Sequence, residues 1–168
     1  MSIFEAIIFG IVEGITEFLP ISSTGHLILT SRLLHLSEAS FIKSFEIAIQ
    51  LGATLSVVVL YWKTLTVNLE VLKKIMAAFI PIAIIGFVFY KVIIKNLMGN
   101  IHVVLWSLFL GGIFLIVFEF YHKESKEMKG EVDDIPYRTA ILIGLFQAFA
   151  VIPGVSRAAA TIIGGLVL

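Results

Sequence analysis

The fold of this chain is decided around the stretch Glu13-Gly-Ile-Thr-Glu17-Phe-Leu-Pro20-Ile-Ser22-Ser23-Thr24-Gly-His26. Two carboxylates, three consecutive hydroxyls and an imidazole interrupt an otherwise apolar segment here. Burying such groups in a lipid bilayer is costly, so membrane proteins retain them where they are paired or take part in function. The stretch therefore predicts a polar site inside a membrane protein.

The composition of the whole chain supports a membrane location. Hydrophobic residues make up 59% of the sequence, charged residues only 14%, and the mean hydropathy is +1.05. Soluble domains carry about 25% charged residues. The net charge of zero gives no support for a nucleic-acid partner. The absence of cysteine excludes disulfides and thiolate metal sites.

Two short apolar runs, Ile3–Leu19 and Thr24–Leu36, flank Pro20. A helix needs about 20 apolar residues to cross the hydrocarbon core, and neither run reaches that length cleanly. We expect residues 3–36 to form a re-entrant helical hairpin, which enters the membrane and returns to the same face. Its non-helical tip must be surrounded by protein or line a polar cavity.

Three longer runs, Phe41–Trp62, Ile75–Ile94 and Ile101–Tyr121, are predicted transmembrane helices. Pro81 should kink the second helix or mark its entry. Glu46 and Gln50, four residues apart in the first span, could line a cavity.

The distribution of lysine and arginine predicts the orientation in the membrane. The first and third connections, Lys63–Lys74 and His122–Arg138, carry seven of these residues, against two around the middle connection, Lys95–Asn100. Cytoplasmic loops are enriched in Lys and Arg, so the first and third connections are predicted to be cytoplasmic. The hairpin over residues 3–36 then opens outward.

Residues 139–168 repeat the plan of the first hairpin. An apolar run ends at Pro153-Gly154, and Ser156-Arg157 opens another run. Gly10-Ile-Val-Glu13 resembles Gly144-Leu-Phe-Gln147, and Pro20-Ile-Ser-Ser23 resembles Pro153-Gly-Val-Ser156. One residue must be gapped to align both pairs. Three spans separate the hairpins, so the second should enter from the opposite face, as in an inverted-topology repeat. We predict one all-α, polytopic membrane domain over residues 1–168, with the two broken tips meeting near the midplane.

The polar residues of the two tips are suited to phosphate chemistry. Glu13 and Glu17 share a helix face, which suits a divalent cation held with phosphate oxygens, or one general base beside one metal ligand. One hydroxyl of Ser22-Ser23-Thr24 should cap the next helix, whose N-terminus would hold a phosphate. His26 is a candidate for proton transfer. A buried Arg157 guanidinium would bind phosphate through two hydrogen bonds.

These motifs resemble a known family. The stretch Glu13–His26 and the segment Pro-Gly-Val-Ser156-Arg157-Ala-Ala-Ala-Thr161 resemble the two signature motifs of the undecaprenyl-diphosphate phosphatases, the bacitracin-resistance membrane enzymes. Phe45–Gly52 also looks like a family segment. The resemblance implies removal of the terminal phosphate from undecaprenyl diphosphate, which recycles the lipid carrier of peptidoglycan synthesis. It also implies a magnesium or calcium ion and a multi-pass protein of the bacterial inner membrane with an outward-facing site.

The resemblance assigns roles by position. The catalytic residues would be Glu17, Ser23 as proposed nucleophile, His26 as proposed base or nucleophile, and Arg157, which binds the diphosphate. Substrate contacts would come from Ser22, Thr24, Ser156 and Thr161, and the metal ligands would be Glu13 and Glu17.

The chain departs from the family pattern in two respects. The family usually has a serine directly after the arginine and then a glycine, where Ala158 and Ala159 stand here. Family chains also continue through several more membrane segments, so this chain is expected to be a C-terminally truncated member.

Three functions fit this sequence. The first is a phosphatase. The second is a membrane transporter or lipid flippase, because inverted repeats with broken helices are typical of transporters. The third is an inactive truncated remnant. Pairing a hydroxyl–histidine cluster with an arginine favours hydrolysis over proton coupling. A polyprenyl diphosphate lipid and the membrane are the expected partners, nucleic acid is not, and a homodimer is an assembly that the sequence allows.

Overall fold

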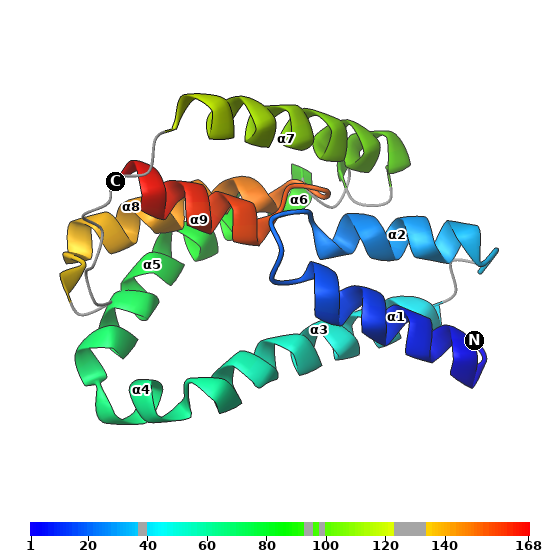
Figure 1. Ribbon diagram of the computed structural model, residues 1–168, viewed down its shortest axis with the longest axis horizontal. Coiled ribbons are helices and arrows are strands. Elements are labelled where there is room, and N and C mark those ends of the chain that lie inside the picture. Colours follow the sequence, from blue (N-terminus) through cyan, green and yellow to red (C-terminus); the bar gives the residue numbers. More distant parts are fainter. Residues whose placement is uncertain (37–39, 93–95, 98–99, 123–133) are drawn as a thin grey trace.

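The computed structural model describes residues 1–36, 40–92, 96–97, 100–122 and 134–168. Within these ranges the regular secondary structure is helical (Figure 1). The principal elements are α1 (Ile3–Thr16), α2 (Ser23–Leu33), α3 (Ser40–Leu60), α4 (Trp62–Val67), α5 (Leu69–Val88), α6 (Tyr90–Val92), α7 (Ile101–Tyr121), α8 (Tyr137–Ala148), the 3₁₀ turn η3 (Phe149–Val151) and α9 (Arg157–Val167).

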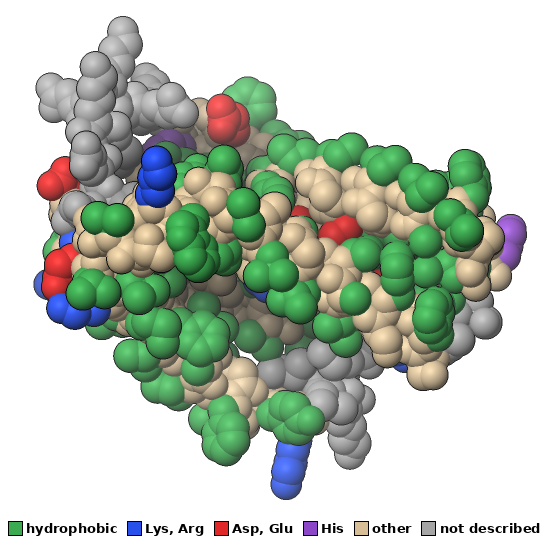
Figure 2. All heavy atoms as spheres, turned by 90° about the horizontal axis from the view of Figure 1, so that it is seen from below, with side chains coloured by type: hydrophobic (Ala, Val, Ile, Leu, Met, Phe, Trp, Pro, Cys, Tyr) green, Lys and Arg blue, Asp and Glu red, His purple; other side chains and the backbone are tan. Residues whose placement is uncertain are grey.

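Helices α3, α5 and α7 are each long and apolar enough to cross a membrane. In the most apolar stretch of each of these helices, at most 11% of the residues are buried inside the protein. Hydrophobic side chains accordingly cover much of the surface (Figure 2). An apolar surface of this extent faces lipid rather than water. The chain is therefore an all-α, multi-pass membrane protein, as the composition predicted.

The ends of α3 and α7 lie within two residues of the predicted spans, but neither end of α5 does, since α5 begins at Leu69 and ends at Val88. The prediction placed Lys63–Lys74 in a loop, whereas these residues form α4 and the first turns of α5. Asn68 explains the early start, because its side-chain oxygen accepts hydrogen bonds from the backbone N–H groups of Glu70 and Val71. Pro81 lies inside α5 and does not mark its entry.

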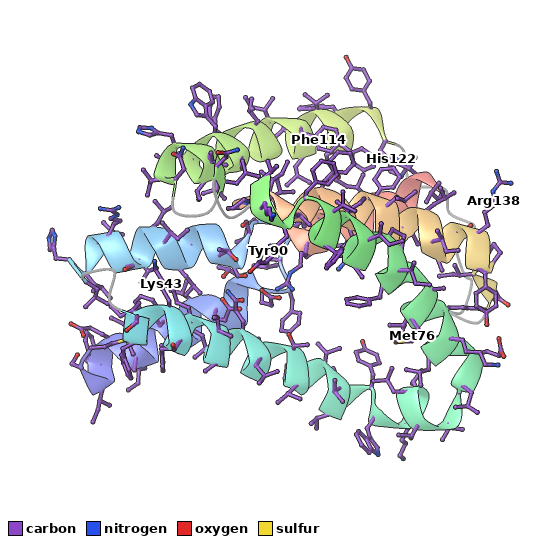
Figure 3. All side chains as sticks on the ribbon, turned by 180° about the vertical axis from the view of Figure 1, so that it is seen from behind. Lys43, Met76, Tyr90, Phe114, His122 and Arg138 are labelled. Atoms are coloured by element: carbon purple, nitrogen blue, oxygen red, sulfur yellow. The ribbon has the colours of Figure 1, made fainter. Side chains whose placement is uncertain are left out.

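A polar cluster outside the tips also stabilises the start of α5. The Tyr137 hydroxyl donates a hydrogen bond of 2.8 Å to Glu70, and Lys73 donates one of 2.6 Å to the other oxygen of the same carboxylate. The Lys74 ammonium lies 5.9 Å from the centre of the Tyr137 ring. These contacts join the first turns of α5 and α8, while Arg138 projects away from the molecule (Figure 3). Most of the predicted loop His122–Arg138 lies outside the described residues.

Two helical hairpins, α1–α2 and α8–α9, point their tips toward one another (Figure 1). Phe9, Leu27 and Ile42 form a buried core between the first hairpin and α3. Two glycines permit close helix contacts. A Cβ on Gly144 of α8 would lie 2.0 Å from the Ala78 carbonyl oxygen of α5. A Cβ on Gly154, whose φ is +93°, would lie 2.7 Å from the Val104 carbonyl oxygen of α7. These close approaches fix the second hairpin against α5 and α7, and with it the position of the tip.

Candidate active site

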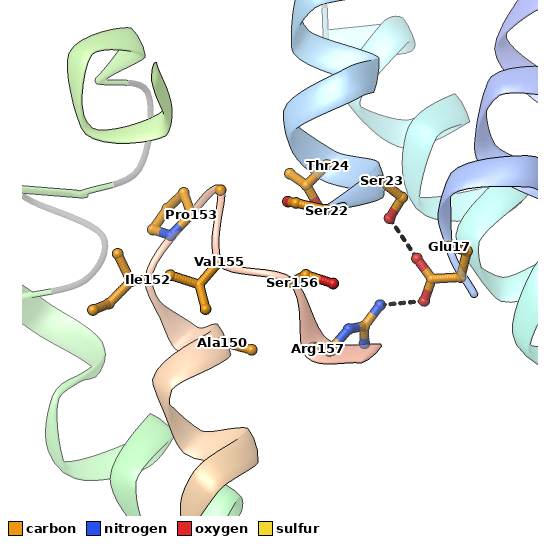
Figure 4. Close-up of a pocket in the computed structure, with 11 residues that line it drawn as sticks. Glu17, Ser22, Ser23, Thr24, Ala150, Ile152, Pro153, Val155, Ser156 and Arg157 are labelled. Carbon is orange, nitrogen blue, oxygen red and sulfur yellow. Dashed lines mark hydrogen bonds and ion pairs between the residues drawn. The ribbon is translucent and has the colours of Figure 1, made fainter. Parts of the chain in front are cut away.

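A polar pocket lies where the two tips meet (Figure 4). The first tip and the start of α2 line one side of it, and the second tip and the start of α9 line the other. The lining residues are Glu17, Ser22, Ser23, Thr24, Ala150, Ile152, Pro153, Gly154, Val155, Ser156 and Arg157. The two tips therefore meet as predicted, whereas their re-entrant topology and their place near the membrane midplane stay predictions.

The Glu17 carboxylate joins the two halves of the pocket. Its Oε2 accepts a hydrogen bond of 2.5 Å from the Ser23 hydroxyl, and its Oε1 accepts one of 2.7 Å from Nη2 of Arg157 (Figure 4). The Glu17 side chain is only 12% exposed, whereas that of Arg157 is 52% exposed. One carboxylate therefore holds a hydroxyl from the first tip and a guanidinium from the second, and the guanidinium remains accessible from the pocket.

Both helices that begin at the pocket are capped by a serine. Ser22 Oγ accepts a hydrogen bond from the Gly25 N–H at the start of α2, and Ser156 Oγ accepts one of 3.2 Å from the Ala159 N–H at the start of α9. The expected cap in the hydroxyl triplet is thus Ser22. The caps leave other first-turn N–H groups of both helices free of intrahelical partners, so the pocket has the positive potential of two helix N-termini.

The helix caps show which residues of the first tip correspond to which residues of the second. The sequence pattern pairs Ser23 with Ser156, but the two capping residues are Ser22 and Ser156. The first helical residues are therefore Ser23 and Arg157, and both donate a hydrogen bond to Glu17.

Glu13 lies one turn before Glu17 and is 1% exposed. Both of its carboxylate oxygens are buried without a hydrogen-bond partner in the described residues. The carboxylate of Glu17 lies close to it. A buried carboxylate that lacks partners, next to a second carboxylate, fits a divalent cation. No cluster of three or more acidic, His or Cys ligands occurs among the described residues, so phosphate oxygens or water would have to complete the coordination.

Besides Glu13, two predicted site residues lie outside the polar pocket. Thr161 donates its hydroxyl hydrogen to the Arg157 carbonyl oxygen one turn earlier in α9 and does not line the pocket. His26 instead lines a second, mostly apolar cavity of about 800 Å³ between α2, α7 and the second hairpin. The two cavities share a wall made of Ile152, Gly154, Val155 and Ser156.

The backbone turn Ile152–Val155 lines the pocket but was not among the predicted site residues. The helix-breaking pair Pro153-Gly154 was the available signal, but a turn's position relative to α7 depends on packing. Glu46 and Gln50, which were suggested to line a cavity, line neither the polar pocket nor the apolar cavity.

Comparison with known proteins supports the resemblance. The family model described as bacitracin resistance protein BacA matches residues 6–168. A protein named undecaprenyl-diphosphatase from Aquifex aeolicus is 54% identical over the whole chain. Proteins of the same name from Bdellovibrio bacteriovorus and Methanococcus aeolicus are 51% and 43% identical, over 100% and 99% of the chain. The chain spans 65%, 64% and 64% of the length of these three relatives.

Proposed function

Because this chain belongs to the bacitracin resistance protein BacA family, we propose that it hydrolyses undecaprenyl diphosphate to undecaprenyl phosphate and inorganic phosphate. The names of its relatives support this substrate. The observation that carries the proposal is the bridge from Ser23 through Glu17 to Arg157, between two helix N-termini. It combines a hydroxyl, a base and a cation in one anion-binding pocket.

The geometry supports Ser23 as the nucleophile. Glu17 Oε2 lies 2.5 Å from the Ser23 oxygen and can accept the hydroxyl proton as that oxygen attacks the terminal phosphorus. The bond from phosphorus to the bridging oxygen then breaks, and undecaprenyl phosphate leaves. Water would hydrolyse the phosphoserine and release phosphate. Attack by water or by His26 remains the alternative for the first step.

Arg157 and the two helix N-termini would stabilise the charge that develops on the phosphate oxygens. The guanidinium uses Nη2 for Glu17 and is half exposed, which leaves other N–H donors for the substrate. Ser22, Ser156 and Thr24 surround the same space. Thr161 would act only through the backbone of Arg157.

We further propose that Glu13 and Glu17 hold a magnesium or calcium ion. When bound, such an ion would polarise a phosphoryl oxygen and neutralise its charge. The two unpartnered oxygens of Glu13 support this assignment. Glu13 is 1% exposed and does not line the pocket, so an ionised Glu13 carboxylate would need a partner other than solvent, which a cation would supply.

The apolar cavity beside the polar pocket supports a lipid substrate. Its size falls in the range of about 300–1,000 Å³ that is usual for ligand pockets. The wall shared by the two cavities would place an isoprenoid chain next to the bound diphosphate. A small soluble diphosphate would leave this apolar space unused.

The cellular setting is part of the same proposal. The protein would lie in the bacterial inner membrane, with the site facing outward, as the lysine and arginine distribution indicates. There it would recycle the lipid carrier for peptidoglycan synthesis and confer bacitracin resistance. The homodimer stays a prediction.

A lipid transporter is the second candidate, because the two opposed broken hairpins are a transporter-like arrangement. The test is phosphate release from undecaprenyl diphosphate in detergent with magnesium or calcium. We would compare the parent chain with Glu17→Gln and Arg157→Ala. The matched controls are Glu119→Gln and Arg138→Ala, which change exposed residues far from the tips.

Release by the parent and both controls, with loss of at least about 100-fold in both site variants, is expected. No release from a folded parent would reject the phosphatase. Movement of labelled lipid between leaflets of a vesicle would then favour the transporter, and its absence would favour the inactive remnant.

A further inference from the structure

The cap of α2 has an unusual backbone conformation. Ser22 has φ +64° and ψ 96°, and it is one of two non-glycine residues with positive φ among the described residues. A non-glycine residue at such angles is strained, and surrounding contacts must hold it there. Ser22 is 5% exposed and lies in the polar pocket. The strain is therefore located at the site itself.

The contacts that hold Ser22 come largely from His26. The Ser22 carbonyl oxygen accepts the His26 backbone N–H at 3.2 Å and also the imidazole Nδ1–H at 2.9 Å. A carbonyl oxygen can only accept, so Nδ1 carries a hydrogen and donates it to this carbonyl. Two bonds from one residue fix the peptide plane between Ser22 and Ser23 relative to α2.

The second tip provides an internal comparison. Its cap, Ser156, has φ −75° and ψ 123°, which is an ordinary extended conformation for a helix cap. The residue four positions later is Ala160, whose backbone N–H alone bonds the Ser156 carbonyl, at 3.0 Å. The strained cap thus has an imidazole four residues on, and the relaxed cap has none.

The strain matters because Glu17 and Ser23 lie on opposite sides of Ser22 along the chain. Rotation of Ser22 toward the angles of Ser156 would move the segment that carries Glu17 relative to α2. The 2.5 Å hydrogen bond from Ser23 to Glu17 would then be lost. The conformation of Ser22 therefore controls the alignment of the nucleophile and its base.

We propose that His26 is a positioning residue, whose Nδ1–H holds Ser22 in its strained conformation and thereby keeps Ser23 against Glu17. This role rests on the proposed phosphatase function for its catalytic consequence. It accounts for the position of His26 beside the apolar cavity instead of the polar pocket. His26 need not touch the phosphate at all.

A double-mutant cycle between His26→Ala and Ser22→Gly tests the proposal. Glycine adopts positive φ without strain, so the imidazole should matter little once Ser22 is replaced. We expect His26→Ala to lower kcat roughly 10- to 100-fold in the parent, but less than about threefold in the Ser22→Gly background. A proton-transfer role predicts instead a similar loss of at least about 100-fold in both backgrounds, which would overturn the proposal.

A conservative variant and a pH profile give a second readout. His26→Asn keeps a side-chain N–H that can donate to the Ser22 carbonyl, and it should retain activity within about tenfold with an unchanged dependence of kcat on pH. His102→Asn, at an exposed position at the start of α7, is the matched control and should behave as the parent. Loss of one limb of the pH profile in His26→Asn alone would assign His26 to proton transfer.

A measurement without substrate separates this proposal from the phosphatase. Nitrogen NMR of histidine-labelled protein in detergent should show His26 as the Nδ1–H tautomer, and Ser22→Gly should restore thermal stability lost in His26→Ala. If the parent releases no phosphate but shows both results, the phosphatase fails while the positioning role stands. An Nε2–H tautomer, or no stability rescue, would refute the positioning role whatever the activity.

Discussion

Replacing Gly154 by alanine tests whether the second tip must approach α7 closely. Gly154 has φ +93°, and an alanine held there would cost about 1–2 kcal/mol in backbone conformation. Its methyl group would lie 2.7 Å from the Val104 carbonyl oxygen and 2.9 Å from the Ser107 Cβ. Overpacking of this kind costs about 1–3 kcal/mol, so the expected loss is about 2–5 kcal/mol.

The same substitution should reduce activity. The tip would have to move away from α7, and Arg157 begins the helix that follows it. The 2.7 Å hydrogen bond from Arg157 to Glu17 would then lengthen or break. A misplacement of about 1 Å at a catalytic group can cost roughly 100-fold in rate. We expect a fall in Tm of at least about 4 °C in detergent and a loss of phosphate release of at least about tenfold.

Gly165→Ala is the matched control. Gly165 lies in the same hairpin, and a Cβ there would meet nothing within 4 Å. Alanine is favoured over glycine inside a helix by about 1 kcal/mol, so this variant should be as stable as the parent or more so, with unchanged activity. If Gly154→Ala behaved like Gly165→Ala in both assays, the close packing of the tip on α7 would be refuted as a requirement of the site.

Three further predictions follow from the same geometry. Ser23→Ala should lower phosphate release at least about 100-fold while changing Tm little; activity near the parent level would exclude Ser23 as the nucleophile. Gly144→Ala should lower Tm, because its Cβ would lie 2.0 Å from the Ala78 carbonyl oxygen, and an unchanged melting curve would contradict this packing of α8 on α5. EDTA should abolish activity, and excess magnesium or calcium should restore it. Glu13→Gln should raise the cation concentration for half-maximal activity at least about tenfold. An unchanged cation requirement in this variant would exclude Glu13 as a ligand.

The long helices could be predicted from sequence because their signal is local. An apolar run of sufficient length places α3 and α7 within two residues of their ends, whatever else the chain does. The start of α5 could not be placed in this way. Its first turns are rich in charge and resemble a loop, but Asn68 caps them and Tyr137 of α8 binds Glu70. Tertiary contacts therefore override the composition there.

The residues of the candidate site could be predicted from the sequence better than the hydrogen bonds between them. Carboxylates, hydroxyls and an arginine at two helix breaks predict an anion site from residue types alone. The pairing of Ser23 with Arg157 as the two donors to Glu17 was not predictable, because the residue patterns align Ser23 with Ser156. Only the observed caps show which residues correspond.

The sequence by itself determined that this chain is a helical membrane protein with two broken hairpins, because hydrophobic length and helix breakers act over a few neighbouring residues. The tertiary structure decided which polar groups meet. Glu17 faces Arg157 across 140 positions of sequence, and Glu13 is buried without a partner among the described residues. These outcomes depend on how the first hairpin packs on α3 and α7 and the second on α5 and α7, and local sequence does not encode that packing.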